Sequence, residues 1–179
     1  LTPPPQYLTM RRITVIRHAK SSWTDSSIAD DQRPLNQRGK DSAPMMGERL
    51  AAQGMTPDLL LSSPAVRAFE TAKAIAEQIG YPEDSIHTDE RLYHAGIEQW
   101  FEVIRTLPED ARHVLCFGHN PGLTHFYNIF SPNPVENIPT CGIFDMDFEV
   151  DDWKELAQAR PRSVSYDYPK SEGLEKVLG

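Results

Sequence analysis

Short uninterrupted apolar runs alternate along the chain with longer segments of helical periodicity. Residues 13–16, 59–61 and 114–117 are runs without polar alternation, which is typical of parallel strands buried on both faces. Four further segments have apolar side chains at the spacing of an amphipathic helix: 38–53, 64–79, 97–107 and 121–130. Strands that alternate with helices predict a three-layer α/β fold, in which helices flank a mostly parallel central sheet.

The C-terminal part follows a different pattern. Residues 142–150 alternate apolar with acidic side chains, and Asp151 and Asp152 then form a predicted turn into residues 153–156. Such alternation indicates a strand with one solvated face. We therefore expect an antiparallel C-terminal hairpin at the edge of the sheet.

Length and charge narrow the possible classes of protein. A chain of 179 residues with 39% hydrophobic side chains is sized for one globular domain, which we assign to residues 11–179, with residues 1–10 as a flexible N-terminal extension. The net charge of −8 argues against nucleic acid or an anionic membrane as partner, because such binding relies on a basic face. A bilayer span needs roughly 20 apolar residues, and we find no such run and expect no membrane contact.

Cysteine and histidine usage gives no sign of a disulfide framework or a metal site. Cys116 and Cys141 are too few for a disulfide scaffold, and the six histidines do not have the spacing of a metal-ligand motif. We therefore expect a reducing, cytoplasmic location, no metal and no other cofactor. We further expect a monomer.

Each of the three apolar runs is followed by polar side chains with a common chemistry. Arg17 and His18 follow the first run, Arg67 lies in the helix after the second, and His119 follows the third. Ligands of open α/β sheets bind beyond the carboxyl ends of the strands, so we expect these four side chains to converge there. Guanidinium groups offer forked donors to phosphate oxygens, and an imidazole can act as a nucleophile. The sequence thus predicts a phosphate site.

Two predicted helix starts add to this site. Ser63 precedes Pro64, and Asn120 precedes Pro121, so each pair has an N-cap residue followed by proline at the first helical position. A helix N-terminus presents free backbone N–H groups, which suit a phosphate.

Three short motifs resemble, in order, the signatures of the histidine phosphatase superfamily: Arg17-His18-Ala19, residues 62–68 and Gly118-His119. Residues 17–23 and 33–39 are similar to the small SixA-like branch of phosphohistidine phosphatases within it. The resemblance implies a phosphoglycerate-mutase-like fold. It also implies a phosphatase in which His18 is the nucleophile and becomes transiently phosphorylated, while Arg17, Arg67 and His119 hold the phosphoryl oxygens.

One departure from the family pattern bears on the substrate. Many relatives carry a carboxylic general acid within the stretch matching residues 89–95, where His94 aligns with the acid and Glu90 is near enough to compete. An alkoxide leaving group needs that proton, whereas the imidazole of phosphohistidine can leave already protonated. We therefore expect a phosphohistidine side chain of another protein as substrate.

Two other functions stay open. A small-molecule phosphomonoesterase of the same superfamily would act on a small phosphate compound. A non-catalytic phosphoprotein-binding module would use the arginines alone, although it would not need His18. Arg33 is open to two interpretations as well, as part of the pocket rim or as a solvated loop charge.

Overall fold

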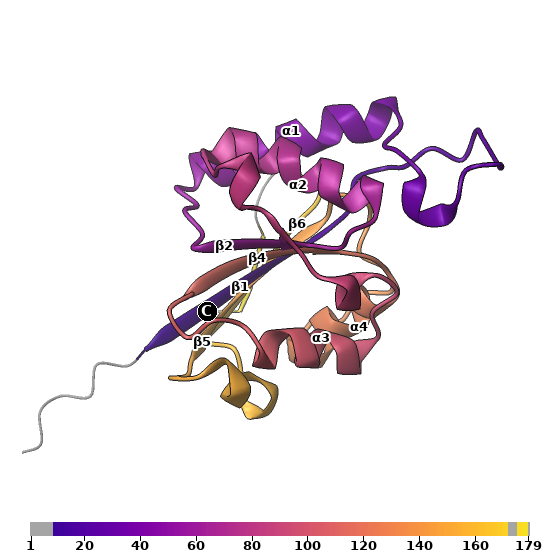
Figure 1. Cartoon of the computed structure of the whole chain (residues 1–179). Coiled ribbons are helices and arrows are strands. Elements are labelled where there is room, and N and C mark those ends of the chain that lie inside the picture. The colour runs from indigo at the N-terminus through magenta and orange to yellow at the C-terminus, as the bar shows by residue number, and fades with distance from the viewer. Residues whose placement is uncertain (1–8, 172–174, 179) are drawn as a thin grey trace, which may run out of the picture.

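A seven-stranded sheet forms the centre of the computed structural model, which describes residues 9–171 and 175–178 (Figure 1). Its strand order is β3-β2-β4-β1-β5-β6-β7. The strands are β1 (Met10–Arg17), β2 (Leu59–Ser62), β3 (His87–Thr88), β4 (His113–Gly118), β5 (Ile143–Glu149), β6 (Ser163–Asp167) and β7 (Glu175–Leu178). The first four in this order are parallel, and β5, β6 and β7 pair antiparallel.

Helices cover both faces of this sheet, so the predicted three-layer α/β fold is confirmed (Figure 1). The α-helices are α1 (Gln37–Ala52), α2 (Val66–Ile79), α3 (Ile97–Arg105) and α4 (Gly122–Phe130). Four 3-10 helices accompany them: η1 (Asp30–Gln32), η2 (Glu83–Ser85), η3 (Glu90–Leu92) and η4 (Trp153–Gln158). The pair α1 and α2 lies on one face, and the pair α3 and α4 lies on the other.

The uninterrupted apolar runs are explained by two cores. Successive side chains of a strand point to opposite faces, so Ile16 packs in the core under α1 and α2 while Val15 packs in the core under α3 and α4. Burial of each such side chain is worth about 1.5–3 kcal/mol. Both faces of β1 therefore need apolar residues.

Two glycines allow the end of β4 and the start of α4 to approach α3 and the loop before it. A Cβ at Gly118 would lie 2.7 Å from Cζ2 of Trp100, and a Cβ at Gly122 would lie 1.8 Å from the carbonyl oxygen of Ala95. A larger residue at either position would push these segments apart. The close approach places His94 next to the end of β4.

The C-terminal antiparallel hairpin exists, but its second strand was misplaced. The return strand is β6, while the expected strand at residues 153–156 is instead the 3-10 helix η4. Trp153 and Leu156, three residues apart, are both buried on one side of η4. Strand β5 is internal, because it pairs with β1 as well as β6. The expected solvated face is also wrong at Asp145, which is buried and paired with Arg12.

The segment boundaries need further corrections. Strand β1 begins at Met10, the last residue assigned to the extension, and residues 1–8 lie outside the described part. Helices α2 and α4 begin after the expected N-caps, since the residues at the N-cap position are Ala65 and Pro121. The side chain of Ser63 still accepts the Ala65 N–H at 3.2 Å.

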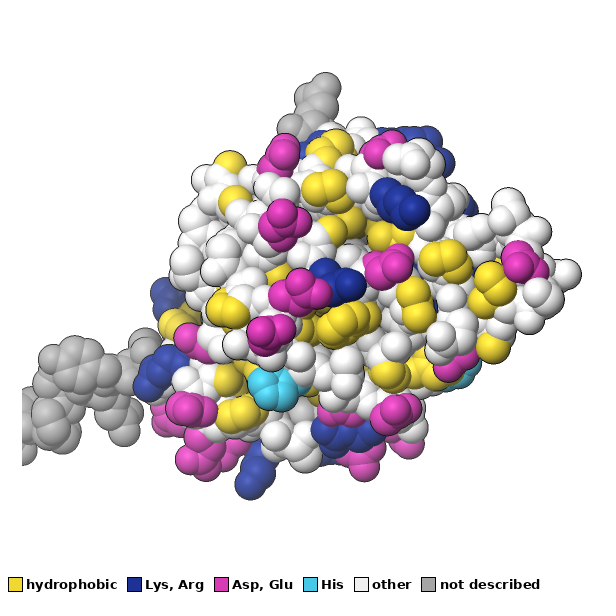
Figure 2. All heavy atoms as spheres, turned by 45° about the horizontal axis from the view of Figure 1, so that its top comes forward, with side chains coloured by type: hydrophobic (Ala, Val, Ile, Leu, Met, Phe, Trp, Pro, Cys, Tyr) yellow, Lys and Arg dark blue, Asp and Glu magenta, His cyan; other side chains and the backbone are white. Residues whose placement is uncertain are grey.

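The surface over α1 and α2 has mixed charge. In Figure 2 the Lys and Arg side chains on this side are separated by acidic, apolar and uncharged ones, unlike the continuous basic face of nucleic-acid binders. Within the described residues, no helix combines the length and apolar character that a membrane crossing requires. The cytoplasmic location stays a prediction.

Candidate active site

A pocket of about 270 Å³ lies at the carboxyl ends of the parallel strands. Arg17 ends β1, His119 follows β4, and Arg67 lies in the first turn of α2, so the predicted convergence is observed. The side chains around the pocket are mostly basic or polar: Arg17, His18, Lys20, Ser21, Trp23, Asp30, Arg33, Arg67, His94, His119, Asn120 and Thr140.

The two ring nitrogens of His18 differ, because Nδ1 is hydrogen-bonded and Nε2 has no hydrogen bond among the described residues. Its Nδ1 lies 2.7 Å from the carbonyl oxygen of Ala19. A carbonyl only accepts hydrogen bonds, so Nδ1 carries the proton and Nε2 keeps its lone pair. Burial, together with the positive charges of Arg67, Arg17 and Arg33, lowers the pKa of His18 to about 4. The imidazole is therefore neutral at pH 7, as a nucleophile must be.

The backbone around His18 is held on three sides. Its N–H donates to the carbonyl of Gly118 at 3.1 Å, and its carbonyl accepts from the N–H of Cys141 at 3.1 Å. The next N–H, of Ala19, donates to Oγ1 of Thr71 at 2.9 Å. Strand β4, the segment before β5 and helix α2 thus fix the position of the imidazole.

His119 lies beside His18, with 5.1 Å between the ring centroids. Its Nε2 is 2.7 Å from Oγ of Ser63, whereas its buried Nδ1 has no hydrogen-bond partner among the described residues. Burial first, and then the neighbouring charges of His18 and Arg67, lower the pKa of His119 to about 3. An unsatisfied buried polar atom costs about 1–3 kcal/mol.

Two buried guanidinium groups supply positive charge. Arg17 donates from Nη1 to the carbonyl of Ile138 at 2.8 Å, and Arg67 donates from Nη1 to the carbonyl of Asp30 at 2.6 Å. The Nε of each has no partner in the described part of the chain. Burial and the adjacent charge of Arg67 lower the pKa of Arg17. Both arginines line the pocket, so they give it positive charge.

Asp30 is the main feature that the sequence did not reveal. Its Oδ2 accepts from the hydroxyl of Tyr93 at 2.6 Å and from Nη2 of Arg67 at 3.0 Å, and its Oδ1 accepts from Nε of Arg33 at 3.1 Å. These donors, Tyr93 foremost, hold the pKa of Asp30 well below its usual range. The ionised carboxylate thus joins the β1–α1 segment, α2 and the segment before α3. The sequence signal available was the three-residue spacing from Asp30 to Arg33.

Arg33 lies at the pocket, so the rim interpretation is confirmed over the solvated one. Its side chain is buried and donates from Nη1 to Oγ of Ser21 at 2.6 Å. Its Cζ lies 3.5 Å from the ring centroid of Trp23, a cation–π contact on an otherwise exposed indole. No pattern in the sequence pointed to a role for Trp23 beyond its place in the stretch 17–23.

His94 and Glu90 differ in their access to the pocket. His94 is exposed on the pocket lining, has a φ of 56°, and packs its ring against Tyr93 at 3.9 Å between centroids. Glu90 lies exposed in η3, outside that lining. Of the two candidates, His94 has the position from which a leaving group could be reached.

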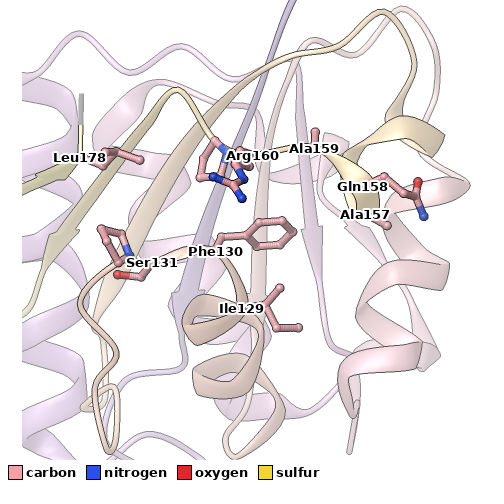
Figure 3. A pocket seen from close by; sticks show the side chains of 10 residues that line it. Ile129, Phe130, Ser131, Ala157, Gln158, Ala159, Arg160 and Leu178 are labelled. Atoms are coloured by element: carbon pink, nitrogen blue, oxygen red, sulfur yellow. The ribbon is translucent and has the colours of Figure 1, made fainter.

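A larger pocket lies elsewhere and has a different character. About 710 Å³ in volume, it is bounded by the end of α4, the segment after η4 and strand β7 (Figure 3). Ile129, Phe130 and Leu178 line it, and Arg160 is its one charged residue among those that the structure describes. By volume alone this pocket would be the candidate active site. Its described lining, however, does not place a nucleophile beside a cluster of cationic side chains.

The described residues contain no group of three or more His, Cys, Asp or Glu side chains placed to hold a metal ion. Cys116 and Cys141 are both buried, and burial raises the pKa of each thiol to about 12.

Comparison with known families and proteins agrees with this geometry. Residues 13–115 match the model of the histidine phosphatase superfamily (branch 1). An uncharacterized chloroplastic protein of Arabidopsis thaliana is 31% identical over 153 residues, which cover 81% of this chain and 70% of that protein. The mitochondrial serine/threonine-protein phosphatase Pgam5 of Drosophila grimshawi is 37% identical over 76 residues, or 42% of this chain and 26% of its own length.

Solved structures share the fold. A crystal structure from Agrobacterium tumefaciens, provisionally assigned as the phosphohistidine phosphatase SixA, has a TM-score of 0.72 at 24% identity and covers 89% of this chain and 98% of that one. The protein histidine phosphatase SixA in complex with tungstate has a TM-score of 0.69 at 19% identity, covering 88% and 94% of the two chains.

Proposed function

The chain belongs to the histidine phosphatase superfamily, and from that premise we propose that it is a phosphatase that forms a covalent phosphohistidine intermediate on His18. Family membership supports the phosphatase activity itself. The observation that carries the proposed nucleophile is the neutral imidazole of His18, whose Nδ1 proton is held by Ala19 while Nε2 keeps its lone pair.

The first step transfers the phosphoryl group to the enzyme. The lone pair on Nε2 of His18 attacks phosphorus, the N–P bond forms, and the bond to the leaving group breaks with its electron pair. Negative charge on the three non-bridging oxygens is stabilised by N–H donors of Arg17, Arg67 and His119. These groups are positioned before substrate arrives, so little reorganisation is needed.

The second step releases phosphate. A water oxygen attacks phosphorus, the N–P bond breaks, and its electron pair returns to Nε2 of His18. The water protons pass to solvent and to the inorganic phosphate, so the starting enzyme is restored. Nδ1 stays protonated throughout because Ala19 continues to accept its hydrogen bond.

We propose a phosphohistidine side chain on another protein as the substrate. Asp30 is ionised in the pocket and cannot donate a proton, which leaves His94 as the candidate acid on the lining. A phosphohistidine leaves as imidazole and needs little protonation, unlike an alkoxide. The exposed rim at Trp23 and His94 suits a group presented on a protein surface. SixA, named for this activity, supplies an analogy of fold.

The proposed reaction uses no metal ion. The nucleophile is a nitrogen that is already neutral, and two guanidinium groups supply the positive charge that a metal would otherwise give. Activity should be unchanged after treatment with a chelator. Loss of activity that returns on addition of a divalent cation would contradict this part of the proposal.

Two experiments test the proposal. Wild type and His18→Ala are assayed in parallel on a phosphohistidine peptide, a phosphoserine peptide and a small phosphate ester. Enzyme mixed with 32P-labelled substrate is quenched in alkali, where phosphohistidine survives. We expect fastest turnover of the phosphohistidine peptide and labelled wild type, with no label on His18→Ala. His125→Ala, which removes an exposed histidine of α4, is the matched control.

Each other result identifies a different function. Faster turnover of the small ester would favour the phosphomonoesterase. Peptide binding without phosphate release or label would favour the binding module. Turnover without label, or label on His18→Ala, would contradict the proposed nucleophile.

A further inference from the structure

A second pocket adjoins the active site. Its volume is about 190 Å³, and Thr140 belongs to the lining of both pockets. Its other lining residues come from the start of α1 and from the segments around β5 and β6: Arg38, Ser42, Pro139, Tyr168, Pro169 and Lys170. The two pockets therefore share a wall at Thr140.

The two linings are basic although the chain is acidic overall. Arg38 and Lys170 are exposed in the second pocket, as is Lys20 in the first, and within the described residues none of the three has a carboxylate at ion-pair distance. Among the described residues, Asp30 is the one carboxylate on either lining, and it is paired with Arg33 and Arg67. Among the described residues, these three cations thus form a strip of positive charge without ion-pair partners beside the active-site pocket, in a protein with a net charge of −8.

The second pocket is built on fixed segments. Arg49 of α1 donates to the Asp167 carboxylate at 2.9 Å and to the carbonyls of Tyr168 and Pro169 at 3.2 Å each. Asp167 is buried, so this ion pair is shielded from water. The chain that carries Lys170 is therefore held against the helix that carries Arg38.

We propose that this second pocket binds a carboxylate of an acidic segment that flanks the phosphorylated side chain of a protein substrate. Arg38 and Lys170 offer charge, and the hydroxyls of Ser42 and Thr140 offer hydrogen bonds to such a carboxylate. The inference rests on the proposed phosphatase function, and adds the surface chemistry of its substrate. Repulsion by the acidic remainder of the surface would orient an acidic partner toward this strip.

Binding of matched peptides tests the assignment. Two fluorescein-labelled peptides carry the same non-hydrolysable phosphohistidine analogue, flanked on both sides by three Glu or by three Gln. Fluorescence anisotropy gives Kd for wild type and for Arg38→Ala/Lys170→Ala. The control double variant Arg105→Ala/Lys154→Ala removes two exposed cations of α3 and η4, on the other face of the sheet.

We expect the wild type to bind the Glu peptide about tenfold more tightly than the Gln peptide, as two surface ion pairs would give. Arg38→Ala/Lys170→Ala should lose most of this preference, and the control variant should keep it. Higher salt should reduce the preference because exposed pairs are screened. Equal Kd values in wild type, or a preference that survives Arg38→Ala/Lys170→Ala, would overturn the proposal.

The same variants separate this inference from the proposed activity. Binding of a small bisphosphate is measured on the same variants. If Arg38→Ala/Lys170→Ala weakens binding of the bisphosphate but not of the peptides, the pocket binds a second phosphate group, and the acidic-segment proposal is overturned. Preference for the Glu peptide without turnover of any phosphorylated substrate would support the second pocket and contradict the phosphatase. Turnover of a phosphorylated substrate without a preference for the Glu peptide would support the phosphatase and contradict the role of the second pocket.

Discussion

The active-site pocket has two halves that are held in different ways. Arg17, His18 and His119 stand at strand ends, where backbone hydrogen bonds such as that from the N–H of Arg17 to the carbonyl of Gly142, at 3.0 Å, fix them. Asp30 and Arg33 come from the β1–α1 segment, which projects beyond the sheet and is held mainly by side-chain contacts (Figure 1). The strand-end half carries the proposed chemistry, and we expect the loop half to contribute mainly to substrate recognition.

Removal of the proposed nucleophile, which belongs to the strand-end half, should have the largest effect on activity. His18→Ala should lower kcat by a thousandfold or more, on the order expected when a nucleophile is lost. Thermal unfolding followed by circular dichroism should show that the fold persists. His125→Ala should retain full activity, and near wild-type turnover by His18→Ala would remove the basis for the comparison.

His94 belongs to neither half, but contacts the loop half through Tyr93. His94→Asn removes the acid while keeping a residue that tolerates the φ of 56°. On a phosphoserine peptide we expect a loss of about 100-fold, the lower end of general acid catalysis. The phosphohistidine peptide should lose much less. Equal losses on both substrates would show that His94 does not act through the leaving group.

Arg67 joins the two halves, because it lines the pocket beside His18 and also pairs with Asp30. Arg67→Ala should remove at least one charge-assisted hydrogen bond, worth about 1.5–3 kcal/mol, and lower kcat/KM by roughly 10- to 150-fold. Arg67→Lys keeps the charge but not the forked geometry, and should recover only part of the loss. Full recovery would mean that charge alone matters.

Disruption of the loop half alone should have a smaller effect. Asp30→Asn removes the charge that orients Arg67 and Arg33, so we expect kcat to fall about tenfold while inorganic phosphate inhibits more strongly. Asp31→Asn is the matched control, since this neighbour is exposed and contacts only Gln32 among the hydrogen bonds described. Weaker phosphate inhibition in Asp30→Asn would contradict the assigned role.

The protonation of His18, in the strand-end half, can be tested by varying the pH, without any substitution. Nitrogen NMR should show His18 with Nδ1 protonated and titrating near pH 4, well below the ordinary value of 6.5. Below pH 6.5, His18 and His119 each bind a proton in the unfolded chain but not in the folded protein. The free energy of unfolding therefore decreases as the pH falls, until both side chains are also protonated in the folded protein at about pH 4 to 3. Urea unfolding at several pH values measures this. Titration of His18 near 6.5 would contradict its burial.

The sequence predicted the elements that bury apolar residues on two faces. The uninterrupted apolar runs of β1, β2 and β4 are typical of strands covered on both faces. Because these strands end at a common edge of the sheet, the residues that follow them come together there: Arg17, His18, Arg67 and His119. Strand β3 has only two exposed residues, too short to give a pattern. The alternation of residues 142–150 identified β5 but not its partners, because pairing depends on the rest of the chain.

The loop half could not be predicted for a physical reason. Asp30 meets Tyr93 and Arg67 only because three segments distant in sequence pack together, and no periodicity records such contacts. Arg33 was noted through resemblance alone. Trp23 looks like any exposed aromatic until Arg33 is seen stacked on it.

The carboxylate of Asp30 gives the proposed phosphate site a counter-ion within the protein itself. Any phosphoryl dianion that enters must share Arg67 with an anion already bonded to it, so net attraction is weaker than two arginines alone would give. We therefore expect the site to hold inorganic phosphate weakly and to release it readily as the product of the proposed reaction.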